Sequence, residues 1–146
     1  MNEKAKILVV EDDIDLVAAI KKILENKGYT AESAYDPEEG WDKIKQNKPD
    51  LIILDVMFGG MGESRGFDFA QKIRYERRFS DIPILMMTAI NTEKPFFNFS
   101  PDTDGEFLPV DGFLDKPVKS DELYLKVEEL LKQKISKWHK WPEKEQ

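Results

Sequence analysis

Carboxylates follow two strongly aliphatic runs of the chain. Glu11 and Asp12 come directly after residues 7–10, and Asp55 comes directly after residues 51–54. A carboxylate is costly to bury without a partner. Carboxylates within a few ångströms of one another also repel, and each close pair costs on the order of 4 kcal/mol at an effective dielectric of about 20. If these groups meet, either one stays protonated or a cation fills the space between them.

Two further polar groups also come at the ends of apolar runs. Thr88 follows the apolar residues 84–87, and Lys116 comes two residues after the run at 112–114. Oxygen ligands without His or Cys suit Mg²⁺, which usually takes one or two carboxylates plus a phosphate. A hydroxyl and an ammonium beside such an ion stabilise a phosphoryl group. Asp55 is then the natural nucleophile, because a carboxylate can form an acyl phosphate.

Apolar runs predict the strands that would position these residues. The runs at 7–10, 51–54 and 84–87 lack alternation, which is typical of strands covered by helices on both faces. Residues 112–114 supply a further strand. Residues 29–34 alternate weakly, which indicates an edge strand. Because ligands in an open parallel sheet bind beyond the carboxyl ends of the strands, the polar groups are expected at one edge.

Helical patterns lie between the strands. They are expected at residues 13–27, from Asp36 towards Pro49, at residues 67–77, and from Ser120 onward. Asp13 and Asp36 are the expected N-caps, and Pro37 suits the first helical position. Strand and helix alternate along the chain, which predicts an α/β fold with a parallel sheet.

Composition limits the class of protein. The 146 residues suit one domain, and the absence of cysteine excludes disulfides and thiolate metal sites. The net charge of −7 argues against broad nucleic-acid binding, which needs clustered Lys and Arg. No apolar run approaches the ~20 residues that span a bilayer. We therefore expect a cytoplasmic protein that binds neither nucleic acid nor a membrane.

Four motifs, taken in order, carry a resemblance to a known family. They are ILVVEDD at 7–13, LIILDVM at 51–57, DIPILMMTA at 81–89 and FLDKP at 113–117. Together they resemble the receiver domain of bacterial two-component response regulators, over nearly the whole chain to about Lys132. The resemblance implies a doubly wound, five-stranded, flavodoxin-like sheet of order 2-1-3-4-5. It also implies phosphoryl transfer from the phosphohistidine of a histidine kinase or phosphotransfer protein to Asp55.

The resemblance implies roles for the acidic residues. Asp12 and Asp55 would bind Mg²⁺ directly, as would the main-chain carbonyl of Met57, while Glu11 would act through water. The chain would catalyse only phosphoryl transfer to its own Asp55 and would turn over no small molecule. Met57 and Ile90 lie at positions that tune hydrolysis of the acyl phosphate in the family, so these apolar residues predict a long-lived phosphorylated form.

The other motif residues would bind and report the phosphoryl group. By the same resemblance, Thr88 and Lys116 would hold its oxygens. Phe113 would be the aromatic switch, whose rotamer follows Thr88 after phosphorylation. Each residue alone has a plainer interpretation: Asp55 as the end of a strand, Lys116 as a solvated lysine in a turn, and Phe113 as a core residue.

Two segments depart from the family pattern. Gly59 stands where a proline is common, and residues 63–65 lengthen the loop before the third helix. Residues 94–110 are rich in Pro and Phe and lie where the family places its fourth helix, so we expect a long ordered loop or a short helical turn there. The fourth-helix region is therefore atypical, and the usual dimer surface is in doubt.

The carboxyl-terminal residues extend the pattern further. We divide the chain into a receiver domain at 1–133 and a helix extension and tail at 134–146, with the last helix continuing towards Pro142. Exposed Trp138 and Trp141 would suit a partner or a homodimer, unless they fold back on the domain. We expect a stand-alone receiver that signals by contact with an unknown downstream protein.

Two other functions remain open. A pseudo-receiver would keep the fold and serve as a phosphorylation-independent binding module, which the unusual loops favour and the intact set of site residues disfavours. A Mg²⁺ phosphohydrolase with an Asp nucleophile is the other alternative. Such enzymes usually carry a second Asp two residues after the nucleophile, where this chain has Met57.

Overall fold

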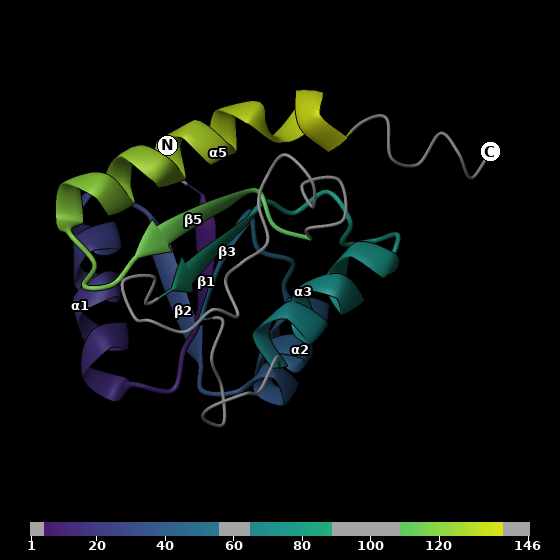
Figure 1. The fold of residues 1–146 in the computed structure, drawn as a ribbon, viewed down its shortest axis with the longest axis horizontal. Coiled ribbons are helices and arrows are strands. Elements are labelled where there is room, and N and C mark those ends of the chain that lie inside the picture. Colours follow the sequence, from purple (N-terminus) through teal and green to yellow (C-terminus); the bar gives the residue numbers. More distant parts are fainter. Residues whose placement is uncertain (1–4, 56–64, 89–108, 139–146) are drawn as a thin grey trace.

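Five parallel strands form the centre of the molecule, and helices cover both faces of the sheet (Figure 1). The arrangement is seen in a computed structural model, which describes residues 5–55, 65–88 and 109–138. The strands are β1 (Lys6–Val10), β2 (Thr30–Ala34), β3 (Leu51–Asp55), β4 (Ile84–Thr88) and β5 (Gly112–Asp115). The sheet order is β2-β1-β3-β4-β5, which confirms the expected doubly wound α/β fold with β2 at one edge.

The described helices lie close to their predicted positions. They are α1 (Ile14–Asn26), α2 (Pro37–Gln46), α3 (Arg65–Tyr75) and α5 (Ser120–Trp138). Both predicted N-caps are confirmed: Asp13 Oδ1 accepts a hydrogen bond of 3.1 Å from Leu16 N, and Asp36 Oδ1 accepts one of 2.8 Å from Glu39 N. These bonds satisfy backbone donors that a helix start leaves open, so short polar side chains fix where α1 and α2 begin.

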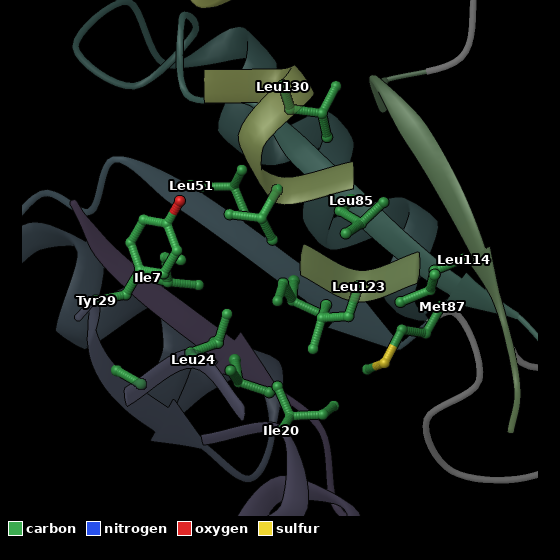
Figure 2. Packing of buried hydrophobic residues seen from close by; sticks show 14 of the residues in the cluster. Ile7, Ile20, Leu24, Tyr29, Leu51, Leu85, Met87, Leu114, Leu123 and Leu130 are labelled. Carbon is green, nitrogen blue, oxygen red and sulfur yellow. The ribbon is translucent and has the colours of Figure 1, made fainter. Parts of the chain in front are cut away.

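Two apolar clusters fill the space on either side of the sheet. Along β1, Ile7 and Val9 belong to the cluster beneath α1 and α5, whereas Leu8 and Val10 belong to the one beneath α2 and α3. Figure 2 shows the first cluster, in which Leu123 of α5 packs over the sheet. Both faces are buried, and this explains the continuous apolar runs of β1, β3 and β4.

Some expectations fall on residues that the structure does not describe. These are Met57, Gly59, residues 63–64, Ile90 and most of the atypical segment at 94–110. Helix α5 is described as far as Trp138 and is continuous across residue 133, while the expected continuation to Pro142 lies outside the described range. The division of the chain after residue 133 stays a prediction. None of the described helices has the length and apolar character needed to cross a bilayer.

Candidate functional site

The predicted site residues lie at the carboxyl ends of neighbouring strands. Glu11 directly follows β1, Asp55 ends β3, Thr88 ends β4, and Lys116 directly follows β5. Strand order reverses between β1 and β3, because β2 lies on one side of this pair and β4 on the other. Such a reversal opens a crevice at the carboxyl edge of a doubly wound sheet. The fold therefore brings together groups that lie far apart in the sequence.

The three acidic residues converge in this crevice. One carboxylate oxygen from each of Glu11, Asp12 and Asp55 lies within 4.8 Å of the others, so the expected convergence is confirmed. Glu11 and Asp55 are buried, and Asp12 is exposed. Glu11 is held at both ends: its main-chain N donates to Ala34 O at 3.0 Å, and its Oε2 accepts from Asp13 N at 3.0 Å.

Lys116 brings the positive charge into the same crevice. Its Nζ lies 3.1 Å from Asp55 Oδ1 and 3.3 Å from Glu11 Oε1. The main-chain N of Lys116 donates to Thr88 O at 2.8 Å, which fixes the end of β5 against the end of β4. Backbone pairing of adjacent strands thus places the ammonium opposite the two buried carboxylates, as the sequence predicted.

The pKa values of Glu11 and Lys116 are both raised, for different reasons. Burial, followed by the charge of Asp55, raises the pKa of Glu11 from 4.5 to about 7, although Lys116 opposes the shift. Burial alone would lower the pKa of Lys116, but the carboxylates of Asp55 and Glu11 outweigh this effect and raise it. The cluster therefore holds a firmly charged ammonium beside a carboxyl group that titrates near neutral pH.

Thr88 and Phe113 lie on the same face of the sheet. Phe113 pairs with Met86 and Asp115 pairs with Thr88, so Phe113 is a diagonal neighbour of Thr88. Phe113 is partly buried against the cluster under α2 and α3. Thr88 is 1% exposed, and within the described part of the chain its Oγ1 has no hydrogen-bond partner. A buried hydroxyl without a partner is costly, so this position calls for a functional explanation.

The donor set fits a divalent cation with a phosphoryl group beside it. Glu11, Asp12 and Asp55 supply only oxygen atoms, which suits Mg²⁺ better than a softer metal. Thr88 adds a buried hydroxyl and Lys116 a cation. The expected contribution of the Met57 carbonyl lies outside the described residues, and the roles assigned to all these groups stay predictions.

A buried ion pair at the opposite edge of the sheet was not predicted. Arg74 Nη2 of α3 lies 2.6 Å from Asp111 Oδ2, just before β5. Arg74 Nη1 also donates to the main-chain oxygens of Ser80 and Ile82, and Asp111 Oδ2 accepts from Ile84 N. The sequence carried a partial signal, because Arg74 lies four residues after Ala70 on the buried side of α3.

Known proteins resemble this chain over most of its length. A model of the response regulator receiver domain matches residues 7–128. The chain is 36% identical over 131 residues to the transcriptional regulatory protein YvrH of Bacillus subtilis, covering 89% of this chain and 50% of that protein. It is 33% identical over 140 residues to the transcriptional regulatory protein RprY of Bacteroides fragilis, covering 96% and 55%. The chain thus spans about half the length of these curated relatives.

A solved structure agrees with the sequence matches. A two-component response regulator from Clostridium difficile superposes with a TM-score of 0.71 and 32% identity, covering 89% of this chain and 98% of that one.

Proposed function

Because this chain belongs to the family of response regulator receiver domains, we propose that it is the phosphoacceptor of a two-component system. A histidine kinase or phosphotransfer protein donates the phosphoryl group, and Asp55 accepts it. The observation that carries the proposal is the convergence of Asp55, Glu11 and Lys116, with the ammonium 3.1 Å from Asp55 Oδ1. A strand terminator alone would need no such surroundings.

The transfer step follows from the chemistry of Asp55. A carboxylate oxygen of Asp55 attacks phosphorus, and the P–N bond to the donor imidazole breaks with its electron pair leaving on nitrogen. The product is an acyl phosphate on Asp55. Lys116 lies where it can offset the charge of the phosphoryl oxygens, and it is already oriented by the backbone bond to Thr88 O.

The acidic cluster would hold Mg²⁺ through Asp12 and Asp55, with Glu11 acting through water. When bound, the ion would neutralise charge on the carboxylates and on the incoming phosphoryl oxygens. The protein's own contribution is to keep Glu11 and Asp55 buried and close together, so that their repulsion is relieved only by a cation or a proton.

Thr88 and Phe113 would convey the phosphorylated state to the surface. The Thr88 hydroxyl gains a partner when a phosphoryl oxygen lies beside it, which removes the cost of its burial. Phe113 lies diagonally from Thr88 on the same face, so a shift of Thr88 changes the space open to its ring. Output by contact with a downstream protein, and a cytoplasmic location, are parts of the same proposal.

The names of the curated relatives describe transcriptional regulators, and those proteins are about twice as long as this chain. Any DNA-directed output in such a protein would come from the part that this chain does not match. The chain itself would transfer a phosphoryl group only to its own Asp55. Turnover of a small phosphate ester would instead support the phosphohydrolase alternative.

The decisive experiment measures phosphoryl uptake. The purified chain is incubated with phosphoramidate or acetyl phosphate and MgCl₂, and intact mass is recorded. We expect the mass of one phosphoryl group to be added, and Asp55→Asn to abolish the gain. Glu32→Gln is the matched control, because Glu32 is an exposed carboxylate on β2.

A pseudo-receiver gives a different pattern. The folded chain would take up no phosphoryl group from any of several donors, and millimolar MgCl₂ would leave its melting temperature unchanged. That combination would overturn the proposal, since an ion that binds only the folded state must raise the melting temperature.

A further inference from the structure

Helices α2 and α3 enclose a groove that the phosphorylation site does not use. A hollow of about 370 Å³ lies between the two helices, and its lining includes Glu38, Trp41, Asp42, Asp68, Phe69 and Lys72. A second hollow, of about 490 Å³, shares Trp41, Asp68 and Lys72 and reaches Tyr75 and Glu76. We name the two together the α2–α3 groove.

The groove has aromatic walls and an acidic rim. Trp41 is half-buried and packs edge-on against Phe69 and Phe79, with ring centroids 6.5 Å and 5.7 Å apart. Tyr75 is 78% exposed at the far end. Glu38, Asp42, Asp68 and Glu76 supply negative charge, against the single cation Lys72 among these lining residues. Such a surface suits a segment that carries both cations and aromatic rings.

The Trp41 ring already binds a cation, the ammonium of Lys72. Its Nζ lies 4.4 Å from the centroid of the Trp41 ring, within the range of a cation–π contact. The carboxylates that line the groove offer partners for further cations. The groove is therefore chemically suited to a peptide segment that is both basic and aromatic.

One segment of the chain itself has that composition. Residues 132–142 (KQKISKWHKWP) contain four lysines, one histidine and two tryptophans, and no acid, although the whole chain carries a net charge of −7. We propose that the α2–α3 groove of one copy binds residues 137–142 of a second copy, with lysines against the acidic rim and tryptophans against Trp41 and Tyr75. The proposal does not depend on phosphorylation of Asp55.

We assign the occupant to a second copy because α5 and the α2–α3 groove lie on opposite faces of the sheet, so that a segment binding the groove of its own copy would have to pass around the sheet. Helix α5 covers the sheet face opposite to α2 and α3 (Figure 1). With the sheet between them, helix axes on opposite faces lie on the order of 20 Å apart. The three residues from Trp138 to Trp141 span at most about 10 Å even when fully extended.

Two copies that bind each other's basic segments form a closed dimer. Each copy offers one groove and one basic segment, so two copies satisfy each other in a symmetric dimer and leave no open end. The two contacts then act together, which strengthens an interface that would be weak if made once. Exposed ion pairs contribute to it, so association should weaken as ionic strength rises.

Charge reversal tests the pairing directly. Sedimentation velocity is measured over a concentration series of the unphosphorylated chain and its variants at low ionic strength. We expect the wild-type chain to dimerise. The segment variant Lys137→Glu/Lys140→Glu and the groove variant Asp42→Lys/Asp68→Lys should each associate at least about tenfold more weakly. An equimolar mixture of the two variants should dimerise again, because each reversed segment then meets a reversed groove.

Controls separate this interface from other effects. Lys22→Glu/Lys119→Glu makes the same change of net charge at exposed residues away from the groove and should leave dimerisation intact. If the groove variant fails to fold, a synthetic peptide of residues 132–142 should compete with wild-type dimerisation, and a peptide with its lysines replaced by glutamates should not. A wild-type chain that stays monomeric, a dimer that survives reversal of the segment, or a mixture that stays monomeric overturns the proposal.

Discussion

Lys116 and Asp55 form a close ion pair, with Nζ 3.1 Å from Oδ1, although neither residue is near the other in sequence. The same ammonium lies 3.3 Å from Glu11 Oε1. It therefore already offsets the repulsion between two buried carboxylates, and it lies where it could meet a phosphoryl group on Asp55. One side chain thus offsets buried negative charge and lies at the place that the proposed function assigns to a phosphoryl group.

Removing the ammonium should destabilise the fold. Lys116→Met leaves Glu11 and Asp55 facing each other, and we expect the free energy of unfolding to fall by about 1–2 kcal/mol at pH 8, a value reduced because Lys116 is partly exposed. Urea denaturation without added Mg²⁺ measures this change in the free energy of unfolding. Adding Asp55→Asn in the same chain should recover most of the loss. Lys119→Met, at an exposed lysine, is the control; an equal loss there would refute the explanation.

Removing the Thr88 hydroxyl should separate function from stability. Thr88→Val keeps nearly the same shape and deletes a buried Oγ1 that has no hydrogen-bond partner in the described part of the chain. We expect stability in urea to be unchanged or to rise by up to about 1 kcal/mol. Phosphoryl uptake by intact mass should persist, but the structural response to phosphorylation should be lost.

Thr88→Ser provides the matched comparison. It keeps the hydroxyl and removes the methyl group, so we expect a small loss of stability and a retained response to phosphorylation. The response can be followed by NMR shifts of Phe113 and its neighbours. If phosphorylation changed the NMR shifts of Phe113 equally in Thr88→Val and Thr88→Ser, the hydroxyl would have no signalling role.

The sequence predicted most of the sheet and the site, because both depend on local patterns. The uninterrupted aliphatic run of β3 required cover on both faces, and the capping residue Asp36 marked the start of α2 correctly. Alternation of strands and helices then placed Asp55 and Lys116 at one edge. Knowing which residues end the strands was enough to predict that these side chains lie close together.

Contacts between residues far apart in the chain were not predicted from the sequence. Arg74 and Asp111 are 37 residues apart, and no local pattern pairs a helix arginine with an aspartate before a distant strand. Trp41 is half-buried: it packs against the cluster beneath α2 and α3 and also forms part of the wall of the α2–α3 groove. Its exposure depends on how far apart α2 and α3 lie, which is set by the whole core.

Breaking the Arg74–Asp111 pair should be among the most damaging single changes away from the site. The side chains of Arg74 and Asp111 are 5% and 2% exposed, so Arg74→Met leaves a buried carboxylate without its main cation. We expect a loss of about 3–5 kcal/mol in the free energy of unfolding. Arg78→Met should change it by under about 0.5 kcal/mol, because the Arg78–Glu76 pair is largely exposed.

The double variant distinguishes the pair from general packing. In Arg74→Met/Asp111→Asn the uncompensated charge is gone, so part of the loss should be recovered relative to Arg74→Met alone. Chemical denaturation of the four proteins gives the coupling energy. Strict additivity of the two single changes would mean that the ion pair contributes little beyond its separate contacts.

Glu11 should make the stability of the chain depend on pH in the absence of Mg²⁺. Its pKa is raised from 4.5 to about 7 by burial first and by Asp55 second. A group with a raised folded pKa stabilises the fold most below its unfolded pKa and loses that contribution as pH rises through the folded value. Between pH 4.5 and 7 the wild-type chain should therefore lose about 1–3 kcal/mol relative to Glu11→Gln.

The same proton should compete with Mg²⁺. Below pH 7 a bound cation must displace the proton from Glu11, so the affinity for Mg²⁺ should fall towards about tenfold per pH unit. Calorimetric titration at several pH values measures this slope. Glu11→Gln carries no proton to displace, so its affinity, although weaker, should vary less over the same range. A wild-type affinity that is constant from pH 5 to 8 would show that Glu11 stays ionised in the folded chain and that Lys116 alone offsets its charge.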